Sequence, residues 1–224
     1  MSEILNGPSI SKHDKPEKII FMLHGYGDNA ANFLHLANPI DQDEWKALYV
    51  ALNAPNYITG NLMGYQWFDL YPNGIYISEA GPREFEKIRN EINYSINKIV
   101  NTMEEYCKSL NLSFADCILM GFSQGGMMTF EVGNFLNKQL AGLVILSGRI
   151  MTNYPIKNKI LKQTPIFISH GEKDEVIPVK SFYDSKDYLS TNKCNVEFHL
   201  LELDGHNISP EAITLLQNFI KKIL

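Results

Sequence analysis

The stretch that most constrains the fold is an apolar run, residues 117–120, followed directly by the pattern Gly-x-Ser-x-Gly over residues 121–125. A segment compatible with a helix then runs from Gly126 to about Asn137. A serine between two glycines, after a strand and before a helix, is typical of a nucleophile held at a sharp turn. Glycines lack Cβ atoms, so strand and helix can approach closely there. We therefore expect Ser123 to project above a sheet at a helix N-terminus, which stabilises negative charge. The alternative is an ordinary glycine turn that carries a surface serine.

Composition excludes several classes of protein. The chain has 224 residues, 45% of them hydrophobic, which suits one compact domain over residues 18–224 after a polar lead-in or edge strand at residues 1–17. A net charge of −5 without a basic patch argues against nucleic-acid binding. No apolar run approaches the ~18 residues of a membrane span, and the N-terminus lacks a secretory pattern. Three cysteines without C-x-x-C spacing predict no disulfide framework and no metal, and we expect a cytoplasmic protein.

Short apolar runs alternate with segments of helical periodicity along the chain. This order predicts an α/β fold, a doubly wound and mostly parallel sheet with helices on both faces. In such sheets, ligands bind beyond the carboxyl ends of the strands, where the candidate functional residues all lie. The expected strands are 18–23, 47–52, 117–120, 142–146, 165–169 and 196–201, and the expected helices are 29–37, 84–110, 126–137, one within 176–192, and 210–224.

The segment 53–82 carries four glycines, three prolines and a dense set of aromatic residues without clear periodicity. A connection of this length is uncommon unless it is functional or disordered, and aromatic residues argue against disorder. We expect a structured loop that forms the wall of a substrate pocket. The alternative is that the aromatic residues only cover an edge of the core. They are Tyr57, Tyr65, Trp67, Phe68, Tyr71 and Tyr76.

A serine nucleophile requires a base, and the base requires an orienting carboxylate. Among six histidines, His206 lies in the loop after the last strand and is the expected base, whereas His24 and His170 could brace turns. Asp174, just beyond the strand 165–169, is the expected carboxylate, because it lies between serine and histidine in the chain. Its rivals are Glu172, Glu175 and Asp204, while Asp28 is expected to cap the next helix.

An acyl-transfer transition state also requires hydrogen-bond donors for its oxyanion. In this order of elements, one donor is the backbone N–H after the nucleophile, which here is Gln124. The other comes from a loop after an earlier strand. We expect the backbone N–H of Tyr26, within His-Gly-Tyr-Gly-Asp at 24–28, to supply it.

Five motifs in order resemble the phospholipase/carboxylesterase family, which includes bacterial carboxylesterases and acyl-protein thioesterases. They are His-Gly-Tyr-Gly-Asp at 24–28, Gln-Trp-Phe-Asp at 66–69, Gly-Phe-Ser-Gln-Gly-Gly at 121–126, the run from His170 to Pro178, and Gly-His at 205–206. The resemblance implies an α/β-hydrolase fold, a triad of Ser123, Asp174 and His206, the Tyr26 and Gln124 amides as oxyanion hole, and no cofactor. It departs at Tyr26, where many relatives carry an aliphatic residue.

The short connection between Ser147 and Pro165 leaves no room for a large cap domain, so we expect an open site. The expected function is hydrolysis of carboxylic or thio esters through an acyl-serine intermediate. A lysophospholipase or peptidase with the same triad and a non-catalytic binding protein are the alternatives. The substrate would be a small or lipid-like ester or thioester, or an acylated protein, and an exposed aromatic loop could support a homodimer. The expected apolar walls are Leu62, Met63, Trp67, Ile177 and Val179.

Overall fold

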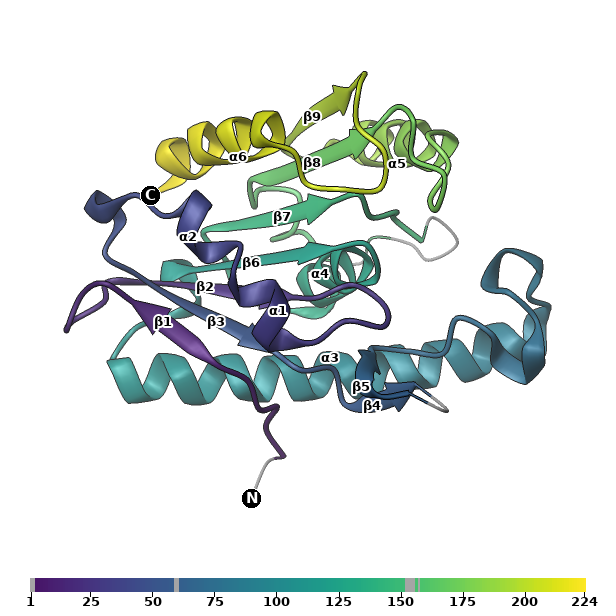
Figure 1. The fold of residues 1–224 in the computed structure, drawn as a ribbon, viewed down its shortest axis with the longest axis horizontal. Helices are drawn as coiled ribbons and strands as arrows, with labels where there is room; N and C mark the ends of the chain where they lie inside the picture. Colours follow the sequence, from purple (N-terminus) through teal and green to yellow (C-terminus); the bar gives the residue numbers. More distant parts are fainter. Residues whose placement is uncertain (1–2, 59–60, 152–155, 157) are drawn as a thin grey trace.

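The computed structural model describes residues 3–58, 61–151, 156 and 158–224 (Figure 1). Its centre is a sheet with the strand order β1-β3-β2-β6-β7-β8-β9. The edge strand β1 pairs antiparallel with β3, and the other strand pairs are parallel. The strands are β1 (Ser9–Ser11), β2 (Lys18–Leu23), β3 (Ala47–Leu52), β6 (Cys117–Phe122), β7 (Gly142–Leu146), β8 (Ile166–Gly171) and β9 (Val196–Leu201).

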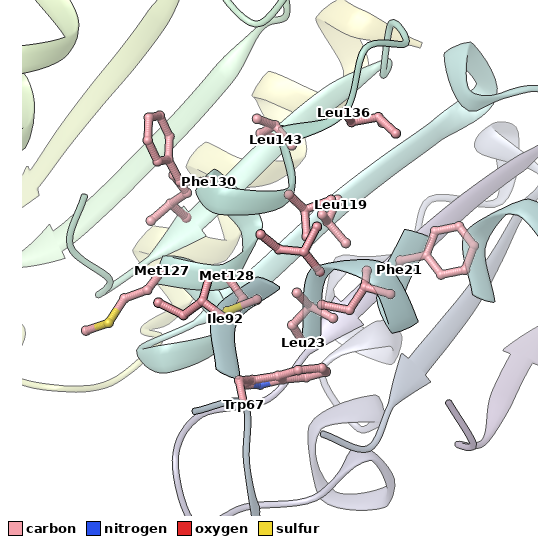
Figure 2. Packing of buried hydrophobic residues seen from close by; sticks show 14 of the residues in the cluster. Phe21, Leu23, Trp67, Ile92, Leu119, Met127, Met128, Phe130, Leu136 and Leu143 are labelled. Atoms are coloured by element: carbon pink, nitrogen blue, oxygen red, sulfur yellow. The ribbon is translucent and has the colours of Figure 1, made fainter. Parts of the chain in front are cut away.

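Helices cover both faces of this sheet and bury two separate hydrophobic clusters. Successive side chains of a strand point to opposite faces. On β2, Ile19, Phe21 and Leu23 therefore enter the cluster beneath α3, α4 and α5. Figure 2 shows part of this cluster. Ile20 and Met22 point the other way and enter the cluster beneath α1, α2 and α6. The expected α/β architecture is confirmed. The helices are α1 (Ala30–Leu34), α2 (Ala37–Ile40), α3 (Pro82–Leu110), α4 (Gln124–Phe135), α5 (Lys180–Thr191) and α6 (Pro210–Ile223).

The long helix α3 follows from its sequence. Pro82 occupies the first helical position, where its missing N–H costs nothing, and Glu84 accepts a hydrogen bond from the Gly81 N–H at 3.2 Å. A stripe of apolar side chains at spacings of three and four, which includes Ile92 and Ile96, is buried against the sheet. Asn111 then ends the helix in the left-handed conformation.

The segment 29–37, expected to form a short helix, contains α1 (Ala30–Leu34), and the second short helix, α2 (Ala37–Ile40), begins at its last residue. α1 does not continue into α2, because a helix that spans both would require a backbone N–H at position 39 to donate to the carbonyl of His35, and Pro39 has none. The capping residue also differs from the expected Asp28. The side chain of Asn29 accepts the Asn32 N–H at 3.0 Å, and Asp28 instead accepts the Asn32 side-chain amide at 2.9 Å.

The segment 53–82 is structured. It contains the antiparallel hairpin of β4 (Asn56–Ile58) and β5 (Asn61–Gln66) and the short 3₁₀ helices η2 (Pro72–Gly74) and η3 (Ile77–Glu79). Figure 1 shows that the hairpin and the chain after it lie along α3. In the part of the chain that the structure describes, no helix has the length and apolar character needed to cross a bilayer.

Candidate active site

Ser123 stands between the end of β6 and the start of α4 in a strained backbone conformation, with φ 54° and ψ −117°. Two glycines permit this turn. A Cβ on Gly121 would lie 2.2 Å from the Gly125 carbonyl oxygen, and a Cβ on Gly125 would lie 2.1 Å from the Leu23 carbonyl oxygen. Because the obstacles are backbone atoms, only glycine fits at either position. The Ser123 N–H donates to the carbonyl of Leu146 on the neighbouring β7 at 2.9 Å, which fixes the turn.

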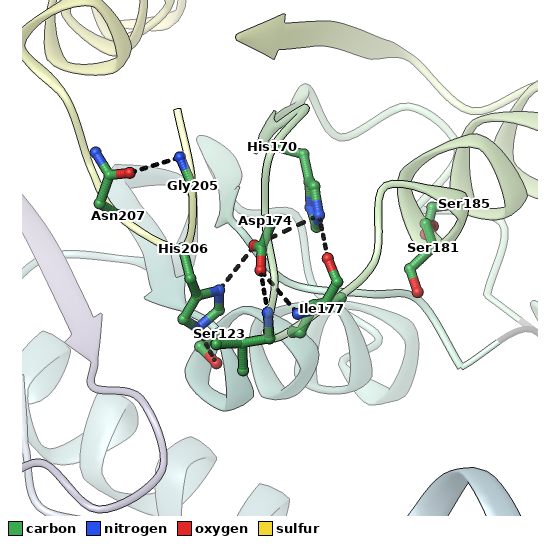
Figure 3. Close-up of polar contacts among 10 residues, drawn as sticks. Ser123, His170, Asp174, Ile177, Ser181, Ser185, Gly205, His206 and Asn207 are labelled. Carbon is green, nitrogen blue, oxygen red and sulfur yellow. Dashed lines mark hydrogen bonds and ion pairs between the residues drawn. The ribbon is translucent and has the colours of Figure 1, made fainter. Parts of the chain in front are cut away.

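The structure brings three expected side chains into one hydrogen-bonded line (Figure 3). His206 Nδ1 lies 2.7 Å from Asp174 Oδ2, and His206 Nε2 lies 3.0 Å from Ser123 Oγ. With its proton on Nδ1, the ring donates to the carboxylate, and Nε2 can accept the serine hydroxyl proton. The arrangement therefore pairs an alcohol with a base, and the base with a carboxylate that orients it.

Asp174 is held rigidly in the loop after β8. Its carboxylate is buried, and Oδ1 accepts the N–H groups of Val176 at 2.9 Å and Ile177 at 2.8 Å. His170 donates from Nε2 to the Ile177 carbonyl at 2.8 Å and so braces the same loop, as expected. Burial lowers the pKa of His170 and favours the neutral ring. The rival Glu172 and Glu175 side chains are exposed, so the loop directs only Asp174 towards His206.

The loop that carries His206 is packed against the end of β8. A Cβ on Gly171 would lie 2.3 Å from the Gly205 carbonyl oxygen, so the two main chains pass in close contact. The Lys173 N–H donates to the carbonyl of Asp204 at 2.9 Å, which joins the two loops. The Phe122 ring lies 4.8 Å from the ring of His206, centre to centre. These contacts hold the imidazole between its two partners.

The loop after β2 lies against the serine. A Cβ on Gly25 would stand 3.4 Å from Ser123 Cβ and 3.3 Å from the Phe122 ring. Within this loop, the Gly27 N–H donates to Tyr65 at 2.9 Å. No hydrogen bond between described residues uses the backbone N–H of Tyr26 or of Gln124. Both expected oxyanion donors are therefore available to a ligand near Ser123.

Comparison with known proteins places this geometry in a family. The model of the phospholipase/carboxylesterase family matches residues 7–224. Acyl-protein thioesterase 1 of Saccharomyces cerevisiae is 30% identical, over 98% of this chain and 99% of that protein. The chain belongs to the phospholipase/carboxylesterase family. It is a hydrolase of the esterase and thioesterase type, and the resemblance of its motifs to this family is confirmed.

Further relatives and solved structures agree with this family. Acyl-protein thioesterase 1 of Debaryomyces hansenii is 29% identical, over 100% of this chain and 99% of that protein. The crystal structure of esterase PE8 superposes with a TM-score of 0.83 at 24% identity, covering 99% of this chain and 100% of that one. The Bacillus cereus carboxylesterase superposes with a TM-score of 0.79 at 16% identity, covering 98% and 95%. At these identities the two structures show the α/β-hydrolase fold and no more.

The motif Gln-Trp-Phe-Asp at 66–69 connects the serine turn to the loop after β2, a role that we did not infer from the sequence alone. The Gln124 side chain is buried; it accepts the Trp67 N–H at 3.0 Å and donates to the Phe68 carbonyl at 2.7 Å. The Trp67 indole N–H donates to the His24 carbonyl at 2.9 Å. In the sequence, only Gln124 in the serine motif and the motif Gln-Trp-Phe-Asp at 66–69 pointed to this connection. Which backbone groups they join depends on the folded positions of β2 and β5.

His24 braces the loop after β2, as expected. Its Nδ1 lies 2.7 Å from the Gly25 carbonyl, and its Nε2 accepts the Ala54 N–H at 3.1 Å. An acceptor nitrogen carries no proton, so this geometry requires a neutral ring. Burial lowers the pKa of His24, which favours the same form.

The structure gives the burial of three of the five residues expected to form apolar walls. Trp67 is fully buried and Ile177 is 5% exposed, and both belong to the hydrophobic cluster on the α3, α4 and α5 face of the sheet. Val179 is partly exposed at the start of α5. Leu62 and Met63 lie in β5, and their side chains are outside the described residues.

Proposed function

We propose that this family member cleaves carboxylic and thio esters through an acyl-serine intermediate on Ser123, with His206 as general base and Asp174 as its orienting carboxylate. The observation that carries the proposal is the His206 ring, which bonds Asp174 through one nitrogen and Ser123 through the other. A non-catalytic binding protein would not require this continuous line of contacts.

The reaction proceeds in two halves. His206 Nε2 removes the hydroxyl proton as Ser123 Oγ attacks the ester carbonyl. The resulting oxyanion accepts hydrogen bonds from the Tyr26 and Gln124 amides, each worth about 2.7–4 kcal/mol in such sites. His206 then gives its proton to the departing alcohol or thiol, and the acyl group stays on Ser123. Water, deprotonated by the same imidazole, attacks the acyl-serine, releases the carboxylic acid and restores the hydroxyl.

The relatives suggest a class of substrate. Two of them carry the name acyl-protein thioesterase 1 and match almost the whole chain. We therefore propose that the natural substrate is a lipid-like ester or thioester, or an acylated protein. Tyr26 lies on the loop after β2, which packs against Ser123, and Val179 is partly exposed at the start of α5; we propose that both contact the acyl or leaving group.

A panel of para-nitrophenyl esters and acyl thioesters of graded chain length tests both parts of the proposal. Ser123→Ala should lose at least about 10⁴-fold in kcat, because the base then has no nucleophile to activate. Ser109→Ala, which changes an exposed serine on α3, should leave kcat unchanged. Full turnover in Ser123→Ala would reject Ser123 as nucleophile, and equal rates at every chain length would reject a lipid-like substrate.

A further inference from the structure

Arg149 lies beside the serine turn at the carboxyl edge of the sheet. It comes three residues after Leu146, whose carbonyl accepts the Ser123 N–H. The residue before it, Gly148, packs on the first turn of α4, since a Cβ there would lie 3.2 Å from Gly126 Cα. The loop after β7 is therefore adjacent to the proposed nucleophile.

The main chain on both sides of Arg149 is fixed. Ser147 adopts a positive φ of 45° and donates its N–H to the Ser169 carbonyl at 2.8 Å. The Ile150 N–H donates to the buried Ser185 Oγ at 3.1 Å. Arg149 thus extends from a well-defined position, which is what a preorganised binding residue requires.

The guanidinium of Arg149 is half-buried without a counter-ion in the described part of the chain. No ion pair or hydrogen bond joins its side chain to a described residue. Burial lowers its pKa, and among the described residues the Tyr76 phenol, in the segment before α3, is the group that acts on it electrostatically. By contrast, Arg89 pairs with the buried Glu131.

Withdrawing a guanidinium from water without a partner is unfavourable. The chain has 25 acidic residues and a net charge of −5, yet none of the described ones is placed beside this cation. This cation, which no described acidic residue pairs, also extends from a loop that packs against the serine turn. An anionic group on the ligand would be the missing counter-ion, which accounts for the half-buried cation and for its place on a loop beside the serine turn.

We propose that Arg149 binds an anionic group of the substrate, a carboxylate or a phosphate, and that this hydrolase prefers esters or thioesters that carry such a group. This inference rests on the proposed function. The planar guanidinium can donate two parallel hydrogen bonds to either anion. The anion can belong to the acyl group or to the leaving group, and substrates distinguish these sources.

The test compares matched charged and neutral esters. For the acyl side, the pair is mono-para-nitrophenyl glutarate and para-nitrophenyl hexanoate; for the leaving-group side, it is meta-acetoxybenzoate and phenyl acetate. Arg149→Gln should lower kcat/KM for the charged member of one pair at least about tenfold, mainly through KM, and change the neutral members less than about twofold. Ten-fold corresponds to about 1.4 kcal/mol, within the range of a charge-assisted hydrogen bond.

Three controls separate the effect of the charge on Arg149 from effects of any substitution or of any surface cation. Arg149→Lys keeps the charge and should retain part of the preference. Lys180→Gln removes an exposed cation at the start of α5 and should leave both ratios unchanged. Raising the NaCl concentration to about 0.5 M should weaken the preference in the parent protein and have little effect in Arg149→Gln.

Two outcomes overturn the inference, and both differ from failure of the proposed function. Arg149→Gln could lower charged and neutral rates equally, or it could leave every rate unchanged. In either case hydrolysis of the neutral esters that still depends on Ser123 would leave the proposed function intact. Hydrolysis of these esters that persists in Ser123→Ala would instead remove the proposed function itself.

Discussion

Replacing Gln124 with alanine should weaken both the stability of the fold and the rate of hydrolysis. The side-chain amide is 1% exposed and makes two hydrogen bonds, one from the Trp67 N–H and one to the Phe68 carbonyl. Gln124→Ala leaves both backbone groups buried without these partners. Each buried group left unpaired costs about 1–3 kcal/mol, which gives about 2–6 kcal/mol in total.

We expect a loss of about 3 kcal/mol in the free energy of unfolding, because a water can enter the emptied space and bond one of the two groups. A domain of this kind is stable by about 5–15 kcal/mol, so the variant should still fold. The backbone N–H of residue 124 remains in place. Trp67, however, is released from the serine turn, and its indole N–H holds the carbonyl of His24. A displacement of about 1 Å can cost about 10²-fold, so kcat should fall roughly ten- to a hundredfold.

Urea unfolding followed by circular dichroism measures the first effect, and initial rates with a short-chain para-nitrophenyl ester measure the second. Gln217→Ala is the matched control, since its partly exposed amide donates to the Pro39 carbonyl at 3.0 Å. This control should change stability by no more than about 0.5 kcal/mol. If Gln124→Ala shifts the urea midpoint no more than Gln217→Ala does, the proposed link between the serine turn and the loop after β2 is wrong.

Three further results are expected from the same geometry. Ser123→Gly should be inactive yet more stable than Ser123→Ala by about 1 kcal/mol in urea unfolding, because glycine tolerates the φ of 54°; equal stability would contradict strain at this turn. Gly171→Ala should lower kcat about a hundredfold while far-ultraviolet dichroism stays unchanged, since the new Cβ displaces the loop of His206; an active variant would contradict this packing. Stability should fall as the pH drops below about 6.5, because burial lowers the folded-state pKa of His24 and the unfolded chain takes up the proton first. His24→Gln should reduce the slope of unfolding free energy against pH between 7 and 5, and an identical slope would exclude His24 as a source.

The parts of the fold that follow from local patterns were predictable from the sequence. Alternating apolar runs and helical stripes indicate a parallel sheet covered on both faces. The order of that sheet places Ser123, Asp174 and His206 at one edge. The positions of these three residues, after β6, β8 and β9, therefore carried most of the information about the candidate site.

The burial of the residues expected to line the site was not predictable, because it depends on which way each side chain faces in the folded chain. Trp67 is aromatic and close to the serine turn, yet it points into the core, since its indole N–H must reach the carbonyl of His24. Ile177 supports the loop of Asp174 from beneath. The segment 29–37 shows the same limit on a smaller scale, because the helix expected there ends at Leu34 and a second one begins at Ala37.

The most direct test of the proposed mechanism is active-site labelling. A fluorophosphonate at low excess should modify the folded parent protein with one label per chain, and peptide mapping should place that label on Ser123. His206→Ala should react far more slowly, because its serine lacks a base. A label elsewhere, or equal labelling of Ser123→Ala and the parent protein, would contradict the mechanism.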